Sequence, residues 1–187
     1  MSAKPGLVAG DLVFLCLLVL AWAAVGLSGS FAYQQGARLE SAKDNGQSFL
    51  RWTESLSAHL QKGQPLAPDV CTAAAVPTSD APSTDSADRL SWALCRQVLL
   101  GQGGALSGLV NPFNSQHPVM GGKCERKQPS ARGMVVVEKG TPSAPGLPPS
   151  TAWAPLPDEE PLQRGLMLRV QVCDGGGYPI RIAEVTL

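Results

Sequence analysis

The stretch from Leu12 to Tyr33 constrains this chain more than any other part of its sequence. No charged residue occurs between Asp11 and Arg38, and most of the 22 residues from Leu12 to Tyr33 are apolar. In a helix these residues rise about 33 Å, slightly more than the hydrocarbon thickness of a bilayer, about 30 Å. We therefore expect a transmembrane helix over residues 11–33, preceded by a short cytoplasmic tail or leader over residues 1–10.

A cleaved signal peptide is the alternative explanation for the same stretch. Ala21, Trp22 and Ala23 resemble the small-residue pattern at which signal peptides are cut. The apolar run, however, continues past this position, and the segment before it carries only one basic residue, Lys4. A retained anchor is therefore the favoured interpretation, and the cleaved peptide stays open as its rival.

The orientation of this helix follows from two opposing signals. Only Lys4 precedes it, whereas Arg38, Lys43 and Arg51 follow it, and by the positive-inside rule this count mildly favours a cytoplasmic C-terminal domain. A short tail before a large domain is instead the arrangement of a signal anchor, and the cysteine content is typical of exported proteins. We expect the N-terminus inside and residues 34–187 outside.

The cysteines support an exported domain. Cys16 lies in the apolar stretch, and Cys71, Cys95, Cys124 and Cys173 follow it. An even number of cysteines in an exported domain predicts two disulfides. Three pairings are possible, of which we favour Cys71–Cys95 with Cys124–Cys173; four free thiols are the alternative. No metal site is expected, because the sequence has no C-x-x-C motif and no histidine at ligand spacing from a cysteine.

Residues 34–62 are predicted to continue the helix with one apolar face. The positions of this packing stripe recur at three- and four-residue spacing: Leu39, Ala42, Gly46, Phe49, Thr53, Leu56 and Leu60. Such spacing is typical of an amphipathic helix, which Gly63 and Pro65 are expected to end. The stripe packs either on its own domain alone or also against neighbouring copies of the chain, and the pattern fits both.

Turn-forming residues dominate the next part of the chain. Residues 64–89 are expected to be mainly loop, leading into a short helix from Ser86 to Leu100 with Asp85 or Ser86 as its N-cap. The sequence Asn111-Pro112-Phe113-Asn114 has the composition of a turn.

The C-terminal third has the pattern of β-strands. Residues 133–139 are rich in valine, residues 141–161 form a Pro-rich loop, and residues 166–173 alternate between apolar and mixed positions. Residues 174–177 make a turn to a partner strand over residues 178–185. We expect three antiparallel strands and an α+β fold class, with a long N-terminal helix, half in the membrane and half amphipathic, packed on a small antiparallel sheet.

Composition and motifs exclude several classes of function. Fifteen basic residues balance fifteen acidic ones, whereas a nucleic-acid binder needs a basic face. The only histidines are His59 and His117, and no Ser/His/Asp set or nucleotide motif is recognisable. A strand rather than a helix follows the three glycines 175–177, so they do not form a phosphate loop. We expect no enzyme activity, no cofactor and no small-molecule substrate.

In layout the chain resembles the type IV pilins and the pseudopilins of type II secretion. The shared features are a short leader, an apolar helix that continues into an amphipathic one, a variable loop with cysteines, and antiparallel strands; the turns at Asn111–Phe113 and Asp174–Gly177 also look similar. The resemblance implies a bacterial inner-membrane protein with a single span and a periplasmic domain, and a cut after Gly10. Asp11 would then be the first residue, and Leu15 would stand where the family carries glutamate, which implies a divergent minor subunit or an unprocessed relative.

Two hypotheses of function follow. The first is a non-enzymatic pilin-like or pseudopilin-like subunit of an envelope or filament assembly, with the membrane and other pilin-like subunits, or copies of itself, as partners. The second is a membrane-anchored periplasmic binding or accessory domain without a filament role, which contacts its partner through the Pro-rich loop and the loop around Asn111.

Overall fold

The computed structural model describes residues 9–62, 91–143 and 150–187. Contacts between residues divide the chain into two units: an N-terminal unit, Met1–Ala37, and a C-terminal unit, Arg38–Leu187. The described elements are a long helix, a short helix, a 3-10 turn and a five-stranded sheet. The predicted α+β class is confirmed, although the sheet is mixed rather than wholly antiparallel.

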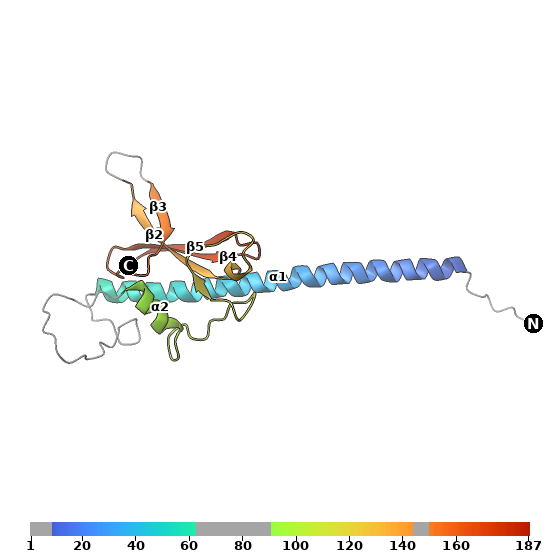
Figure 1. The fold of residues 1–187 in the computed structure, drawn as a ribbon, viewed down its shortest axis with the longest axis horizontal. Coiled ribbons are helices and arrows are strands. Elements are labelled where there is room, and N and C mark those ends of the chain that lie inside the picture. Colours follow the sequence, from blue (N-terminus) through green and yellow to red (C-terminus); the bar gives the residue numbers. More distant parts are fainter. Residues whose placement is uncertain (1–8, 63–90, 144–149) are drawn as a thin grey trace, which may run out of the picture. The chain divides into compact units, whose positions relative to one another are not determined.

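Helix α1 runs without interruption from Ala9 to Gln61 (Figure 1). The two segments expected from sequence, residues 11–33 and 34–62, are therefore parts of one helix. Gly63, the expected end signal, lies outside the described residues, and the helix already ends two positions before it.

The C-terminal half of α1 provides one wall of the core. Ala42, Phe49, Thr53 and Leu56 are fully buried, and all four belong to the predicted packing stripe. The Phe49 ring lies 5.4 Å from the Trp52 ring and 5.8 Å from that of Trp92, with an edge-on geometry in the second pair. The centre of the stripe therefore packs inside its own unit, which both interpretations require.

Gly46 sits where α1 comes closest to the sheet. A Cβ at this position would lie 2.8 Å from Cγ1 of Val172 and 3.0 Å from Cγ1 of Ile182. Val172 is fully buried, so its side chain cannot move aside without disturbing the core. The sequence placed this glycine on the packing stripe, and the structure shows that the small residue permits close packing there.

We expect Gly46→Ala to lower the free energy of unfolding by about 1 kcal/mol. Overpacking destabilises a protein by about 1–3 kcal/mol, and the higher helix propensity of alanine offsets only about 1 kcal/mol of this loss. The midpoint of urea unfolding of the full chain in detergent measures the change. Gly36→Ala is the matched control, because nothing lies within 4 Å of a Cβ there. A rise in the Gly46→Ala midpoint would contradict the close-packing role.

Helix α2, Trp92–Leu100, is shorter than the predicted helix from Ser86. Its N-cap is Ser91, whose side chain accepts a hydrogen bond from the backbone N–H of Leu94 at 3.5 Å, and not Asp85 or Ser86 as expected. The predicted cap residues lie outside the described residues. Trp92, Cys95 and Leu99 are the buried face of α2.

The sheet has the order β1-β2-β4-β5, and β3 also pairs with β2. The strands are β1 Met120–Gly121, β2 Val135–Pro142, β3 Thr151–Pro155, β4 Met167–Cys173 and β5 Pro179–Thr186. The three predicted antiparallel strands correspond to β2, β4 and β5, each within a few residues of its expected bounds. Strand β1, which pairs parallel with β2 through two residues, was not predicted.

The predicted Pro-rich loop over residues 141–161 is wrong in part, because it contains strand β3. This strand pairs antiparallel with the end of β2, from Glu138 opposite Pro155 to Pro142 opposite Thr151. The many prolines of residues 141–161 hid this strand from sequence analysis. Proline lacks a backbone N–H, so it is tolerated only on an outer strand or at a strand end, the positions that Pro142 and Pro155 occupy here.

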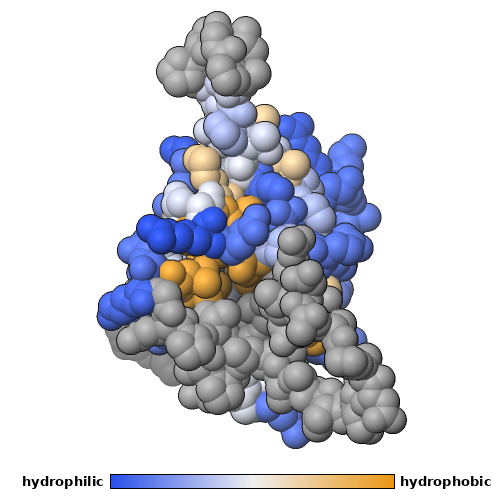
Figure 2. All heavy atoms as spheres, turned by 90° about the vertical axis from the view of Figure 1, so that its left-hand side faces the viewer, coloured by the Kyte–Doolittle hydropathy of each residue, from blue (hydrophilic) through white to orange (hydrophobic). Residues whose placement is uncertain are grey.

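The alternation predicted for β4 is confirmed as far as Val170, and the residues from Val170 to Cys173 are all buried. Leu168, Val170 and Val172 are buried in the main core, which they share with the apolar face of α1. The opposite face of the sheet carries a second, smaller cluster of buried residues: Ala131, Met134, Val136 and Cys173. Seen from the end of the C-terminal unit that contains the end of α1, the described surface is mostly hydrophilic around a smaller hydrophobic area (Figure 2).

Candidate functional site

The most distinctive surface of the N-terminal unit is the apolar segment of α1, residues 12–33. Its large apolar side chains are all exposed: Leu12, Val13, Phe14, Leu15, Leu17, Leu18, Val19, Leu20, Trp22, Val25, Leu27, Phe31 and Tyr33. They surround the helix on every side and include no charged residue. A helix of this length and composition is sufficient to cross a membrane.

The polar group of Ser28 is satisfied within this segment. Its hydroxyl donates to the carbonyl of Ala24 at 2.9 Å, with the carbonyl of Val25 at 3.0 Å. Satisfying a hydroxyl against its own helix removes the cost of placing it in hydrocarbon. Cys16 is also exposed here and is a free thiol. The segment therefore presents a surface compatible with lipid along its length.

The expected processing position lies at the start of this helix. Gly10 is part of α1 and exposed, and Asp11 follows it in the same helix. The leader residues 1–8 lie outside the described residues. The helix therefore begins before the predicted cut between Gly10 and Asp11.

The packing stripe on α1 contacts other residues of the C-terminal unit. Ala42, Phe49 and Leu56 are fully buried in the core, while Leu39 and Leu60 at the two ends are half-buried. Contact between neighbouring copies would have to use a surface other than this stripe.

Three of the four cysteines of the C-terminal unit lie in the described residues, and their bonding agrees with the favoured pairing. Cys124 forms a disulfide with Cys173, with a sequence separation of 49 residues. Cys95 is also disulfide-bonded. Cys71, its expected partner, lies outside the described residues. The Cys124–Cys173 bond joins the loop before β2 to the end of β4.

Asn111 has a structural role that the sequence indicated only as a turn. Its Oδ1 accepts from the backbone N–H of Phe113 at 3.0 Å, and its Nδ2 donates to the carbonyls of Pro118 at 3.0 Å and Arg132 at 2.8 Å. Asn111 is only 2% exposed. Asn111 therefore holds two loop segments together, and its side-chain polar groups are used within the unit.

Each histidine ring lies next to a polar atom of its own segment. Nδ1 of His59 lies 2.7 Å from the carbonyl oxygen of Ser55 in the preceding turn of α1, and Nε2 of His117 lies 3.2 Å from Nδ2 of Asn114. Within the described ranges, no three His, Cys, Asp or Glu side chains come together in a way that suits a metal ion.

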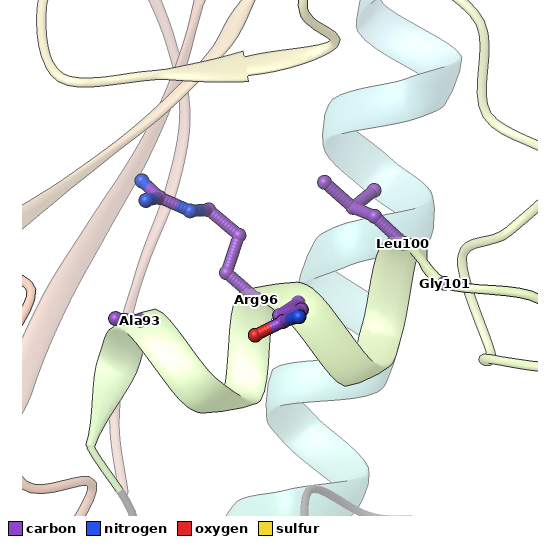
Figure 3. A pocket seen from close by; sticks show the side chains of 5 residues that line it. Ala93, Arg96, Leu100 and Gly101 are labelled. Atoms are coloured by element: carbon purple, nitrogen blue, oxygen red, sulfur yellow. The ribbon is translucent and has the colours of Figure 1, made fainter.

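A shallow hollow lies along the outer side of α2 (Figure 3). Ala93, Arg96, Gln97, Leu100 and Gly101 line it. Arg96 forms an ion pair with Asp158 at 3.1 Å, so its guanidinium is not an unpaired charge in the hollow. Among the described residues, the lining of this hollow includes no nucleophile and no acid–base pair.

The structure also reveals a cationic loop that sequence analysis did not single out. Lys123, Arg126 and Lys127 are exposed in the segment between β1 and β2. Lys123 forms an ion pair with Glu125 at 2.6 Å, and this hydrogen bond together with the carboxylate charge raises the pKa of Lys123. The K-x-x-R-K spacing was a visible signal, but one short basic run in a neutral chain is usually only a solvated surface.

Comparison with known proteins adds no relative: no protein-family model, curated protein or solved structure matches this chain. The described fold and surfaces define an α+β chain with one long, exposed apolar helix segment.

Proposed function

We propose that this chain is a non-enzymatic, single-pass membrane subunit of a bacterial envelope assembly, built on the pilin-like plan. The observation that carries the proposal is the division of α1. Its residues 12–33 are apolar and exposed on all sides, while its residues 42–56 form the core wall of a small α+β unit. One helix thus combines an anchor with the spine of a domain.

The disulfides support an external position for the C-terminal unit. Cys124–Cys173 and the bonded Cys95 require an oxidising compartment, because cytosolic thiols are kept reduced. With the N-terminus of the helix inside, that compartment is the periplasm. This orientation agrees with the signal-anchor arrangement. We give the disulfides more weight than the small excess of basic residues after the helix, which favours the opposite orientation.

The departures from the pilin pattern define which kind of subunit is proposed. Asp11 would be the first residue after cleavage at Gly10, and Leu15 replaces the glutamate of the family. A glutamate that pairs with a neighbour's N-terminal amine is thus missing. A divergent minor subunit, or an anchored relative that is never processed, therefore fits better than a major filament subunit.

The second candidate, an anchored accessory domain without a filament role, is favoured by one observation. The apolar stripe that would pack neighbouring copies together is buried inside its own unit. Under this alternative the exposed surfaces of the C-terminal unit bind a different protein, and the chain stays monomeric in the membrane.

The mature N-terminus, measured by intact mass and peptide sequencing of protein extracted from membranes, tests the proposal. A start at Asp11, above all a methylated one, would establish prepilin processing. A start at Met1 or Ser2 would identify an unprocessed anchor. A start near Ala24 would mean a cleaved signal peptide and would overturn membrane anchorage.

Oxidative crosslinking in membranes distinguishes assembly from a monomeric accessory domain. Cys16 is an exposed free thiol in the anchor, so copies that pack through this face are expected to form a disulfide-linked dimer. The Cys16→Ser variant is the control. Moving the cysteine to Leu17, Leu18 and Val19 in that background is expected to give crosslinking on one helix face only. Equal, weak crosslinking at all four positions would indicate random collision and exclude a defined assembly.

A further inference from the structure

The C-terminal unit has a distinct end at which α1 enters it. Asn45 of α1 donates from Nδ2 to the carbonyl of Val110 at 3.0 Å, and Gly46 packs against Val172 near the end of β4. The loop that starts at Val110 and the turn between β4 and β5 therefore lie beside the beginning of the packed half of α1 (Figure 1). We call this the entry end.

The opposite end is fixed by a second contact. The hydroxyl of Ser57, three turns further along α1, donates to the carbonyl of Thr186 at 2.9 Å. The segment that leads into β4 also lies there, because Gly165 donates to the carbonyl of Leu187 and Leu187 to that of Leu166. The two ends of the unit are thus defined by independent hydrogen bonds.

Positive charge gathers at the entry end. The cationic loop, Lys123–Lys127, is tied to the β4–β5 turn by the Cys124–Cys173 disulfide and by the Arg126 guanidinium, 4.5 Å from the centre of the Tyr178 ring. Residues 101–133 carry four basic residues and one acidic residue, and Asp174 in the β4–β5 turn is a second acid. The charges of α1 from residue 38 to residue 46 cancel, so the entry end has a net charge of +2 in a chain that is neutral as a whole. Within the described residues, neither Arg126 nor Lys127 forms an ion pair.

Exposed apolar side chains gather at the same end. In the described part of the C-terminal unit the large apolar side chains that are exposed are Leu94, Val110 and Tyr178. Val110 is 53% exposed and Tyr178 is 47% exposed, and both belong to the entry end. A tyrosine that carries an arginine on its ring is an amphipathic pair of the kind enriched at membrane–water interfaces.

The covalent chain keeps this end near the membrane if the apolar segment is inserted. Asn45, whose contact with Val110 marks the entry end, follows Tyr33 by 12 residues, which is a rise of about 18 Å along a helix. Arg38, the first residue of the C-terminal unit, is exposed. A tether this short gives the entry end a high effective concentration at the bilayer surface.

We propose that the entry end docks on the anionic headgroups of the bilayer that holds the anchor. Arg126 and Lys127 would bind lipid phosphates, and Tyr178 and Val110 would lie at headgroup level. The inference rests on the proposed function, because it requires the apolar segment to be inserted. Its consequence is a C-terminal unit whose distance from the membrane depends on lipid charge.

The test uses the full chain reconstituted into two kinds of vesicle. One contains only phosphatidylcholine, and the other about one part phosphatidylglycerol to two parts phosphatidylcholine. Modification of Lys123 and Lys127 by an amine-reactive reagent is read by mass spectrometry. A basic residue held near an anionic surface gains about a fivefold preference for it. We expect both lysines to be modified at least fivefold more slowly in the anionic vesicles, and about 1 M salt to abolish the difference.

Matched charge reversals separate docking from a general effect of charge. Arg126→Glu/Lys127→Glu is expected to remove the dependence on anionic lipid at Lys123. Lys62→Glu/Arg164→Glu reverses two exposed charges at the opposite end and is expected to leave it intact. Equal modification of the unaltered chain in both vesicles would overturn the proposal. Protection that appears in both lipids and grows with protein density would also overturn it, because a second copy would then be the partner.

Alkaline extraction of the same vesicles distinguishes a failure of docking from a failure of membrane anchorage. A chain that is not extracted is inserted, so lipid-independent modification would then refute docking alone. A chain that is extracted from both vesicles would refute the membrane anchor and, with it, the proposed function.

Discussion

Two arginines in the middle of the apolar segment, as Leu20→Arg/Ala24→Arg, are expected to release the chain from membranes. The two positions lie one turn apart near the centre of residues 12–33, and both are exposed. An arginine at the centre of a transmembrane helix costs about 2.5–3.5 kcal/mol on the insertion scale, so the pair costs roughly 5–7 kcal/mol. That penalty shifts the insertion equilibrium about 10⁴-fold or more.

Flotation of the expressed chain with membranes, followed by alkaline extraction, measures this release. The swap Leu20→Ala/Ala24→Leu is the control, because it keeps the composition of the segment and should stay in the membrane fraction. The C-terminal unit lies outside the substituted segment, so its Cys124–Cys173 disulfide should still form in an oxidising buffer. An arginine variant that remains resistant to extraction would mean that this segment is not the anchor.

Removing the Cys124–Cys173 disulfide, as Cys124→Ala/Cys173→Ala, is expected to lower the free energy of unfolding by about 4 kcal/mol. The bond closes a loop of 49 residues, and in the chain-entropy model a loop of this size restricts the unfolded chain by about that amount. Domains of this kind are stable by only about 5–15 kcal/mol in total. The variant should therefore unfold at a much lower urea concentration than the unaltered chain.

The Cys16→Ala variant is the control for this measurement. Its thiol is free and lies outside the C-terminal unit, so the urea midpoint of that unit should not change. Since Cys173 is fully buried, the alanine variant also loses the packing of a sulfur atom in the smaller core cluster. A loss below about 1 kcal/mol would show that the native contacts, and not the crosslink, keep the loop in place.

Much of the fold could be predicted from local patterns. The apolar segment and the stripe through Phe49 and Leu56 specify α1, because helical periodicity is written into adjacent residues. The alternation from Leu168 to Val172 specifies β4 for the same reason. Strand β3 could not be predicted, because its pairing with β2 joins residues 9 to 17 positions apart and the surrounding prolines argue against a strand.

The surfaces of the C-terminal unit were beyond local reasoning. The entry end includes residues that are far apart in sequence, Val110, Arg126 and Tyr178. They are placed there by the hydrogen bond from Asn45, the sheet register and a disulfide. The close approach at Gly46 likewise depends on Val172, which lies 126 positions later in the chain. Sequence periodicity shows which face of an element is buried, but not which distant segment covers it.

The pairing of α1 with strands β4 and β5 has a consequence for biosynthesis. Ser57 contacts Thr186 across 129 positions, so this part of the core can close only after β5 has been synthesised. Phe49 can meet Trp92 of α2 earlier, whereas the close contact of Gly46 with Val172 has to wait for β4. Because closing so long a loop costs conformational entropy before the contact stabilises the fold, we expect docking of the sheet on α1 to be the slow step of folding.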